Sequence, residues 1–360
     1  MGFARNFREG SPLRAAGQAL RVTAVALAGA WNLGAGPAAA ISEQNFVADY
    51  ASLVLPYYEA GSGGSFISEQ GVRLSFRVFN RGAASPAIVL LPGYSESYRK
   101  YAELIFDLGS RGYSIYTMDP RGQGASQRLT PLHDLGHVDD FENYVRDLDT
   151  FVTRFVLPGH HPRLFLLAHS MGAAIAARYL PDHPRVFDAV VFSSPMFRIN
   201  TGDTDETFAY FGSWWKTVTG KAEQPVDGLD RYGYAGEATV DQSRVTSSPP
   251  RWHLSEQIIR DDPALAMGGV SYGWLFQALI ATAGIERMAN LLQVPVVILK
   301  AGGDAIVKTD SDDWYCGQSR VPCTVISAPF KDAKHEILQE RDAMRDPAIA
   351  AIAAILAAFR

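Results

Sequence analysis

Six short, apolar, β-branched runs recur along the chain, and they constrain its fold more than any other feature. They lie at residues 87–91, 114–118, 164–168, 189–193, 294–300 and 323–328. A continuous apolar run of this length suits a strand that is buried on both faces of a parallel sheet. Stretches of helical periodicity separate these runs, at residues 98–110, 140–155, 172–180 and 346–360. The alternation predicts an α/β fold with a mostly parallel, doubly wound sheet and right-handed crossovers.

Two local patterns add detail to this expectation. Residues 65–80 alternate between apolar and polar side chains around Gly71, which predicts a β-hairpin before the first buried strand. Asp346 and Pro347 suit the cap and first turn of a helix, so the last helix is expected to begin there.

The strand pattern breaks once, over residues 196–291, which contain no buried-strand run. The simplest interpretation is a helical cap inserted between two halves of the core, 41–195 and 292–360. Because ligands bind at the carboxyl ends of such strands, a cap would cover the site. The alternative is that its aromatic side chains form a small core of their own. Four tryptophans in this segment are candidates for contacting the substrate: Trp214, Trp215, Trp252 and Trp274.

Residues 1–40 differ from the rest of the chain. Four arginines precede a short apolar stretch over 22–31, and small residues follow at 38–40. This is the pattern of a secretory signal peptide with cleavage after Ala40, which predicts a periplasmic or secreted protein. The alternative is an uncleaved N-terminal anchor that associates the protein with the inner membrane, since the apolar stretch is shorter than the roughly 20 residues of a spanning helix.

Cysteine content and charge exclude several classes of site and partner. Cys316 and Cys323 are the only cysteines, and a glycine and a proline between them favour a turn. In an oxidising compartment they could form a local disulfide, although two unrelated thiols are the alternative. No C-x-x-C or other zinc-site spacing occurs, and no cofactor is expected. The net charge of −5, without a long basic run, argues against a nucleic-acid partner.

The sequence around Ser170 combines a strand, a tight turn and a helix. The apolar run ends at Ala168, and Gly172 opens an alanine-rich helical stretch. This is the arrangement of a nucleophile elbow, whose usual pattern G-x-S-x-G keeps small residues where the strand and helix backbones approach each other. Here Ala168 replaces the first glycine, and the alternative reading is a serine that merely caps a helix.

A serine nucleophile needs a base and an orienting acid, which follow the serine along the chain in the order acid, then histidine. Of the eight histidines, only His335 comes after the last strand runs. Asp304 follows the run 294–300 at the expected sheet edge, so it is the predicted acid. Three more aspartates lie further into the same loop: Asp310, Asp312 and Asp313.

Acyl transfer also needs backbone donors for the developing oxyanion. One is expected from the N–H of Met171, directly after the serine, and the other from the N–H of Tyr94, in the loop after the run 87–91. The side chain of Glu96 lies in the same loop, but its spacing assigns it no role.

Several segments together resemble a known family. They include LLPGYSESYRKYAEL, MDPRGQGASQR, LLAHSMGAAIAARYL and KHEILQERDAMR, and the likeness extends from about residue 65 to the C-terminus. They resemble bacterial lysophospholipases of the monoacylglycerol-lipase-like branch of serine α/β-hydrolases, in which an alanine before H-S-M-G is an expected feature. The resemblance implies an α/β-hydrolase fold with a helical cap, no metal, single-chain lipid esters as substrates, and Ser170, Asp304 and His335 as the triad.

Three functions follow as hypotheses. The first is a serine hydrolase that cleaves the ester of a monoacyl lipid, with a lipid or small ester as its partner and peripheral membrane association. The second keeps the triad but acts on a small ester or a peptide N-terminus, whose amine Asp203, Asp205 and Glu206 would hold. The third is a non-catalytic binding protein of the same fold.

Overall fold

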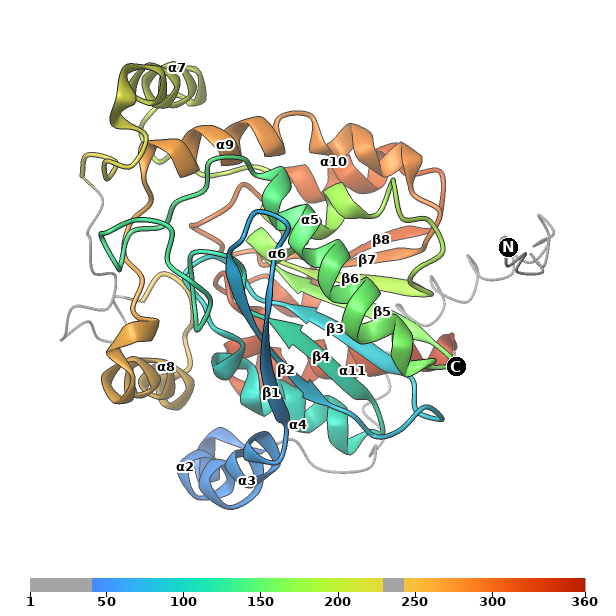
Figure 1. Ribbon diagram of the computed structural model, residues 1–360. Helices are drawn as coiled ribbons and strands as arrows, with labels where there is room; N and C mark the ends of the chain where they lie inside the picture. Colours follow the sequence, from blue (N-terminus) through green and yellow to red (C-terminus); the bar gives the residue numbers. More distant parts are fainter. Residues whose placement is uncertain (1–40, 229–242, 360) are drawn as a thin grey trace, which may run out of the picture.

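The computed structural model describes residues 41–228 and 243–359, which form an eight-stranded sheet with helices on both faces (Figure 1). The strand order is β1-β2-β4-β3-β5-β6-β7-β8. The strands are β1 Ser62–Ile67, β2 Arg73–Phe79, β3 Ala87–Leu91, β4 Ser114–Met118, β5 Leu164–His169, β6 Ala189–Ser193, β7 Val296–Leu299 and β8 Cys323–Ile326. β1 and β2 form the hairpin predicted around Gly71, and β3 to β8 run parallel to one another. The α/β fold predicted from the six apolar runs is therefore confirmed.

Ten α-helices are described, and those that pack on the sheet lie on both of its faces. The ten are α2 Phe46–Asp49, α3 Leu55–Glu59, α4 Ala102–Ser110, α5 Glu142–Phe151, α6 Met171–Tyr179, α7 Glu206–Lys216, α8 Pro249–Asp261, α9 Tyr272–Thr282, α10 Asp310–Gln318 and α11 Asp342–Ala358. Side chains of β3 alternate between the two cores, because successive residues of a strand point to opposite faces. Val89 and Leu91 join the core under α5 and α6, whereas Ile88 and Leu90 join the core under α4 and α11.

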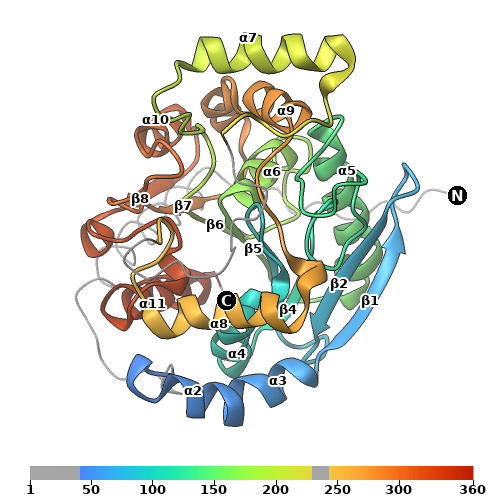
Figure 2. The same ribbon diagram turned by 90° about the vertical axis from the view of Figure 1, so that its left-hand side faces the viewer.

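One local expectation fails for a tertiary reason, and one helical segment had no counterpart among the expectations. The last helix begins at Asp342 rather than at Asp346, so Pro347 lies inside it. The turn before the proline is held by the fully buried Arg345, which donates to Asp107 at 2.6 Å and to the carbonyl of Leu338 at 3.0 Å. The helical segment 43–59, which packs on the core beside α4 (Figure 2), was not predicted at all.

The segment between β6 and β7 contains α7, α8 and α9. Figure 2 shows α7 and α8 at opposite ends of the side of the molecule where the parallel strands end. α8 is fastened to the core by Arg251, a fully buried side chain that pairs with Glu103 and Asp342, each at 2.9 Å. Removing one member of such a buried ion group is costly, because it leaves a buried charge without its partner. The ion pairs of Arg251 therefore stabilise the position of α8.

The predicted signal or anchor segment, residues 1–40, lies outside the described residues. Within the described ranges, no helix is long and apolar enough to cross a bilayer.

Candidate active site

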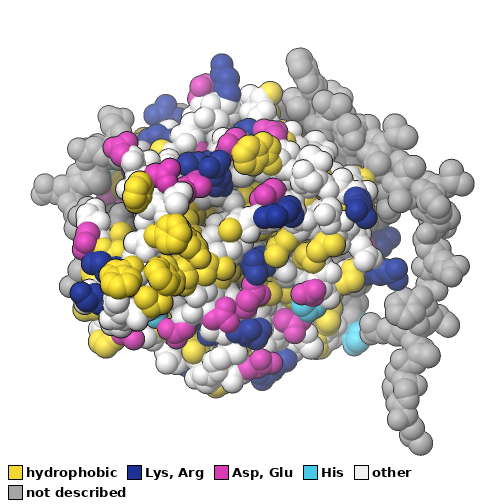
Figure 3. Space-filling view, turned by 90° about the horizontal axis from the view of Figure 1, so that it is seen from above, with side chains coloured by type: hydrophobic (Ala, Val, Ile, Leu, Met, Phe, Trp, Pro, Cys, Tyr) yellow, Lys and Arg dark blue, Asp and Glu magenta, His cyan; other side chains and the backbone are white. Residues whose placement is uncertain are grey.

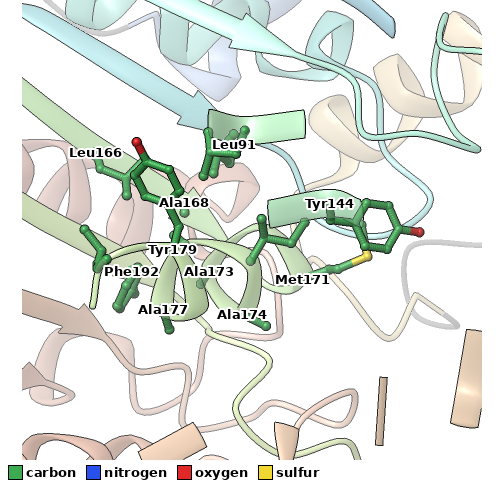
Figure 4. Close-up of a cluster of buried hydrophobic side chains, with 14 of the residues drawn as sticks. Leu91, Tyr144, Leu166, Ala168, Met171, Ala173, Ala174, Ala177, Tyr179 and Phe192 are labelled. Carbon is green, nitrogen blue, oxygen red and sulfur yellow. The ribbon is translucent and has the colours of Figure 1, made fainter. Parts of the chain in front are cut away.

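Ser170 stands at the corner between β5 and α6, with a φ of 50° and a ψ of −118°. A positive φ is strained for a residue with a side chain, and the strain is tolerated where the surrounding structure imposes it. A Cβ at Gly172 would lie 2.7 Å from the carbonyl oxygen of Leu91, so the helix approaches β3 too closely for any larger residue. Ala168 is also fully buried, in the small-residue packing around this corner shown in Figure 4. The elbow therefore needs its glycine at position 172 and accepts one methyl group at position 168.

The structure brings the three predicted triad residues together although they are far apart in the sequence. His335 Nε2 lies 2.9 Å from Ser170 Oγ, and His335 Nδ1 lies 2.7 Å from Asp304 Oδ2. The other oxygen of Asp304 accepts hydrogen bonds from the backbone amides of Ile306 and Val307. Burial alone would raise the pKa of Asp304, but the contact with His335 and these amides hold that pKa below its usual value. The carboxylate stays ionised and fixes the imidazole with Nε2 directed at the serine.

The three competing aspartates lie elsewhere. Asp313 pairs with Lys300 at 2.6 Å, and Asp310 lies 3.5 Å from Arg198. Asp312 is completely buried, and neither of its oxygens has a hydrogen-bond partner among the described residues. Because burial without a partner disfavours the charged form, the pKa of Asp312 rises to about 8.

Asp312→Asn should therefore change how stability depends on pH. In the native protein Asp312 keeps its proton up to about pH 8, whereas in the unfolded chain it loses the proton near pH 4, so its contribution to stability falls as pH rises between these values. The variant lacks this loss. We expect the melting temperature of Asp312→Asn to rise relative to the native protein as pH goes from 4 to 8. A difference that is constant with pH would contradict the assignment.

The two predicted oxyanion donors lie on either side of Ser170. Met171 begins α6, and Tyr94 follows Pro92 and Gly93 at the end of β3. A Cβ at Gly93 would lie 3.1 Å from the Cβ of Ser170, so the loop runs directly beside the nucleophile. In the described part of the chain, neither amide donates a hydrogen bond to another protein group. Both are available to an oxyanion formed on a substrate carbonyl.

The four candidate tryptophans occupy different environments. Trp274 of α9 is buried, and its ring centroid lies 4.8 Å from that of Tyr94, next to the oxyanion loop. Trp252 of α8 is buried as well. Trp214 and Trp215 lie on the solvent-facing side of α7 and are 40% and 60% exposed. The contact of Trp274 with Tyr94 therefore links one of the four tryptophans to the oxyanion loop.

The two cysteines are joined. Cys316, in α10, and Cys323, at the start of β8, form a disulfide with an S–S distance of 1.99 Å. Of the alternatives left open by the sequence, the structure has the local disulfide. The described residues include no group of three or more histidine, cysteine, aspartate or glutamate side chains arranged to hold a metal ion.

Comparison with known proteins places this site in a family. The family model described as serine aminopeptidase, S33 (Hydrolase_4), matches residues 82–342, which is more than half of the chain. This chain belongs to the Hydrolase_4 family. The triad and the elbow described above lie within the matched range, and the chain is accordingly a serine hydrolase with an α/β-hydrolase fold.

Curated relatives of this Hydrolase_4 protein are lipid hydrolases by name. Lysophospholipase L2 of Escherichia coli strain K12 is 30% identical over 314 residues, covering 86% of this chain and 92% of the relative. Monoacylglycerol lipase of Mycolicibacterium smegmatis is 29% identical and covers 68% of this chain and 79% of the relative. A solved structure of a soluble variant of monoglyceride lipase from Saccharomyces cerevisiae, in complex with a substrate analogue, has a TM-score of 0.63 at 16% identity, covering 84% of this chain and 97% of that one. The last likeness supports the fold alone.

Sequence reasoning missed one cluster beside the triad. Glu96, Lys100 and Glu336 are buried, and Lys100 pairs with both glutamates. The available signals were the four-residue spacing of Glu96 and Lys100 and the position of Glu336 directly after His335. A charged side chain in a loop is usually solvated, so these signals alone did not indicate burial.

Proposed function

We propose that this protein hydrolyses the carboxylic ester of a monoacyl lipid, such as a lysophospholipid or a monoacylglycerol. The observation that carries the proposal is the hydrogen-bonded chain from Ser170 through His335 to Asp304, at 2.9 and 2.7 Å. The names of the relatives, lysophospholipase L2 and monoacylglycerol lipase, supply the substrate class.

The geometry supports an acyl-enzyme mechanism. Ser170 Oγ attacks the ester carbonyl while its proton passes to His335 Nε2, and the resulting oxyanion accepts hydrogen bonds from the amides of Tyr94 and Met171. As the tetrahedral intermediate collapses, the carbon–oxygen bond to the headgroup breaks, and the leaving alcohol takes the proton from His335. Water then attacks the acyl-serine with His335 as base, which releases the fatty acid and restores Ser170. Asp304 stabilises the imidazolium in both halves of the reaction.

Two alternatives use the same triad. A small-ester carboxylesterase would differ only in its substrate. An aminopeptidase, which the family description suggests, would need free acidic groups to hold a substrate amine. Of the three candidates, Asp205 caps α7 through the amide of Thr207, and Glu206 is already paired with Arg198 and Lys308. A purely binding protein would have no use for the complete triad.

A substrate panel tests the proposal. Purified protein is incubated with a monoacylglycerol, a lysophosphatidylcholine, p-nitrophenyl butyrate and an aminoacyl p-nitroanilide, and the released product is measured. We expect fatty acid from one or both monoacyl lipids at a higher kcat/KM than for the short ester, and no anilide cleavage. Turnover of the short ester alone would support the carboxylesterase, and anilide cleavage the aminopeptidase.

We also propose that α7 docks the enzyme onto a lipid surface. Its outward side chains repeat at helical spacing and, with Val218 in the helical turn that follows, form one exposed apolar stripe: Phe208, Phe211, Trp214, Trp215 and Val218. Apolar side chains gather on this face in Figure 3. An exposed aromatic stripe of this kind suits insertion at a membrane interface, where a monoacyl substrate resides.

Phe208→Ser/Trp215→Ser should test this docking. We expect the variant to lose most binding to phosphatidylcholine vesicles in a flotation assay and to hydrolyse vesicle-bound monoacylglycerol about tenfold more slowly, because two large apolar anchors are lost. Its kcat/KM for soluble p-nitrophenyl butyrate should be unchanged. Val47→Ser/Leu53→Ser, which changes exposed apolar residues of the N-terminal helical segment, is the matched control. Equal vesicle binding by both variants, or a dimer that the α7 substitutions dissociate, would refute docking on lipid.

Export is a further proposal, supported by the disulfide between Cys316 and Cys323 and by the signal-like composition of residues 1–40. The exported protein would be periplasmic or secreted, or inner-membrane-associated if the N-terminus is retained. Cell fractionation with mass spectrometry of the mature N-terminus tests this, and full-length protein in the cytoplasm would exclude it.

A further inference from the structure

A buried ion group joins the two loops that carry the catalytic amide and the catalytic base. Lys100 Nζ lies 2.9 Å from Glu96 Oε1 and 2.5 Å from Glu336 Oε1. All three residues are buried, with 7%, 5% and 6% of their surfaces exposed for Lys100, Glu96 and Glu336. Glu96 belongs to the loop of Tyr94, and Glu336 follows His335 in the chain. One ammonium group therefore bridges a loop after β3 and a loop after β8.

Glu96 extends this bridge to the oxyanion loop itself. Its Oε2 accepts a hydrogen bond from the amide of Gly93 at 2.7 Å and one from the hydroxyl of Tyr101 at 2.5 Å. The side-chain amide of Gln123 donates to the carbonyl oxygens of Gly93 and Glu96, at 2.6 and 2.8 Å. The peptide that directs the Tyr94 amide is thus held at several points, and Glu96 is the one connected to Lys100.

The pKa values of the two glutamates in this group are shifted in opposite directions. Burial by itself would raise the pKa of Glu96, but Lys100, His169 and the hydroxyl of Tyr101 bring that pKa down to about 2. Burial raises the pKa of Glu336. His169 lies between the loops, with its ring centroid 4.8 Å from that of His335, and burial lowers its pKa to about 4, so it is neutral at physiological pH. Glu96 is therefore the carboxylate of this group that stays ionised, and it lies 2.9 Å from Lys100 Nζ.

A buried ion group contributes little net stability compared with apolar side chains of the same size, because desolvation opposes the attraction between the charges. Its directional contacts can instead fix the relative position of the segments that it joins. The tolerance here is small, because a Cβ at Gly93 would lie only 3.0 Å from the ring of His169 and 3.1 Å from the Cβ of Ser170.

We propose that Lys100 is a positioning residue, which holds the oxyanion loop and the His335 loop in register through Glu96 and Glu336. This inference rests on the proposed serine-hydrolase function and extends it to residues that do not touch the substrate. Oxyanion contacts form in the transition state rather than with the bound ester, so a displaced amide lowers kcat more than it changes KM.

Lys100→Met provides the direct test, with p-nitrophenyl butyrate as a soluble substrate and assays run well below the melting temperature of each variant. We expect kcat to fall on the order of 100-fold while KM changes by less than about threefold. Arg251→Met is the matched control, because it also removes the cation of a buried ion group, between α8 and the core. Its melting temperature should fall, but its kcat should stay within about twofold of the native value, since Arg251 holds no part of the oxyanion loop. Lys100→Arg, which keeps the charge, should recover at least tenfold of the lost kcat.

Isosteric variants keep the proposal testable if Lys100→Met does not fold. Glu96→Gln and Glu336→Gln should each lower kcat, and the double variant should lose less than the product of the two single effects, because both act through one lysine. Native kcat in Lys100→Met, equal losses of kcat in Lys100→Met and Arg251→Met, or fully additive glutamate effects would overturn the proposal. Failure of the proposed function is distinguishable, because the native protein itself would then hydrolyse no ester.

Discussion

Ser170→Ala is expected to lower kcat/KM for a monoacyl ester by about 10⁶-fold, since it removes the atom that would form the acyl-enzyme. The hydroxyl lies 2.9 Å from His335 Nε2, and no other described hydroxyl is within hydrogen-bond distance of that nitrogen. Residual turnover would come only from the oxyanion donors and from substrate binding. Fatty-acid release and labelling by a fluorophosphonate probe both measure this effect.

Ser193→Ala serves as the control for that experiment. Ser193 is also a fully buried serine at the end of a parallel strand, but its hydroxyl has no partner among the described residues. It should keep native turnover and probe labelling. Labelling that persists in Ser170→Ala would show that another residue is the nucleophile.

Asp304→Asn is expected to lower kcat by about 10⁴-fold, the second-largest effect. The side-chain amide of asparagine can present N–H to His335 Nδ1, which favours the tautomer with a proton on Nε2 and leaves that nitrogen unable to accept the proton of Ser170. The substitution also removes the charge that stabilises the imidazolium. KM should change little, because Asp304 lies behind His335 and contacts no substrate atom.

Asp312→Asn is the control for this experiment. It tests whether the loss of any buried carboxyl group in the same segment lowers activity. The carboxyl group of Asp312 is buried with a raised pKa of about 8, so its substitution removes no charge at neutral pH. We expect its kcat at pH 7 to remain native, with the stability change described above. A similar loss of activity in both variants would argue against Asp304 as the unique orienting acid.

The four aspartates after β7 show what the sequence could and could not predict about the site. Asp304 was predicted because it follows a buried strand by two glycines, whereas Asp310, Asp312 and Asp313 lie only a few residues further on. The structure brings Asp304 to His335, whereas it buries Asp312 with no hydrogen-bond partner among the described residues. Spacing along a loop predicts which edge of the sheet a side chain approaches, but the path of the loop decides which carboxylate meets the histidine.

The ends of the strands could be predicted from the sequence, whereas the start and orientation of some helices could not. Strands β3, β4 and β6 end where their apolar runs end, because burial on both faces leaves a continuous pattern in the sequence. The start of α11 at Asp342 depends instead on ion pairs of Arg345 with residues more than two hundred positions away. Trp214 and Trp215 were predicted as substrate contacts, but their exposure of 40% and 60% on α7 was not predictable. Composition shows that a tryptophan is present and not which way its helix is turned.

The sequence by itself determined the α/β fold, the strained corner at Ser170 and the order of serine, aspartate and histidine, since these depend on local periodicity and on residues that a turn requires. Only the tertiary structure decided that Glu96, Lys100 and Glu336 meet beside the triad, that Asp312 is buried without a partner, and that Arg251 fastens α8. The physical reason is that burial and charge pairing depend on contacts between distant segments. No local pattern in the chain encodes the distance between two loops.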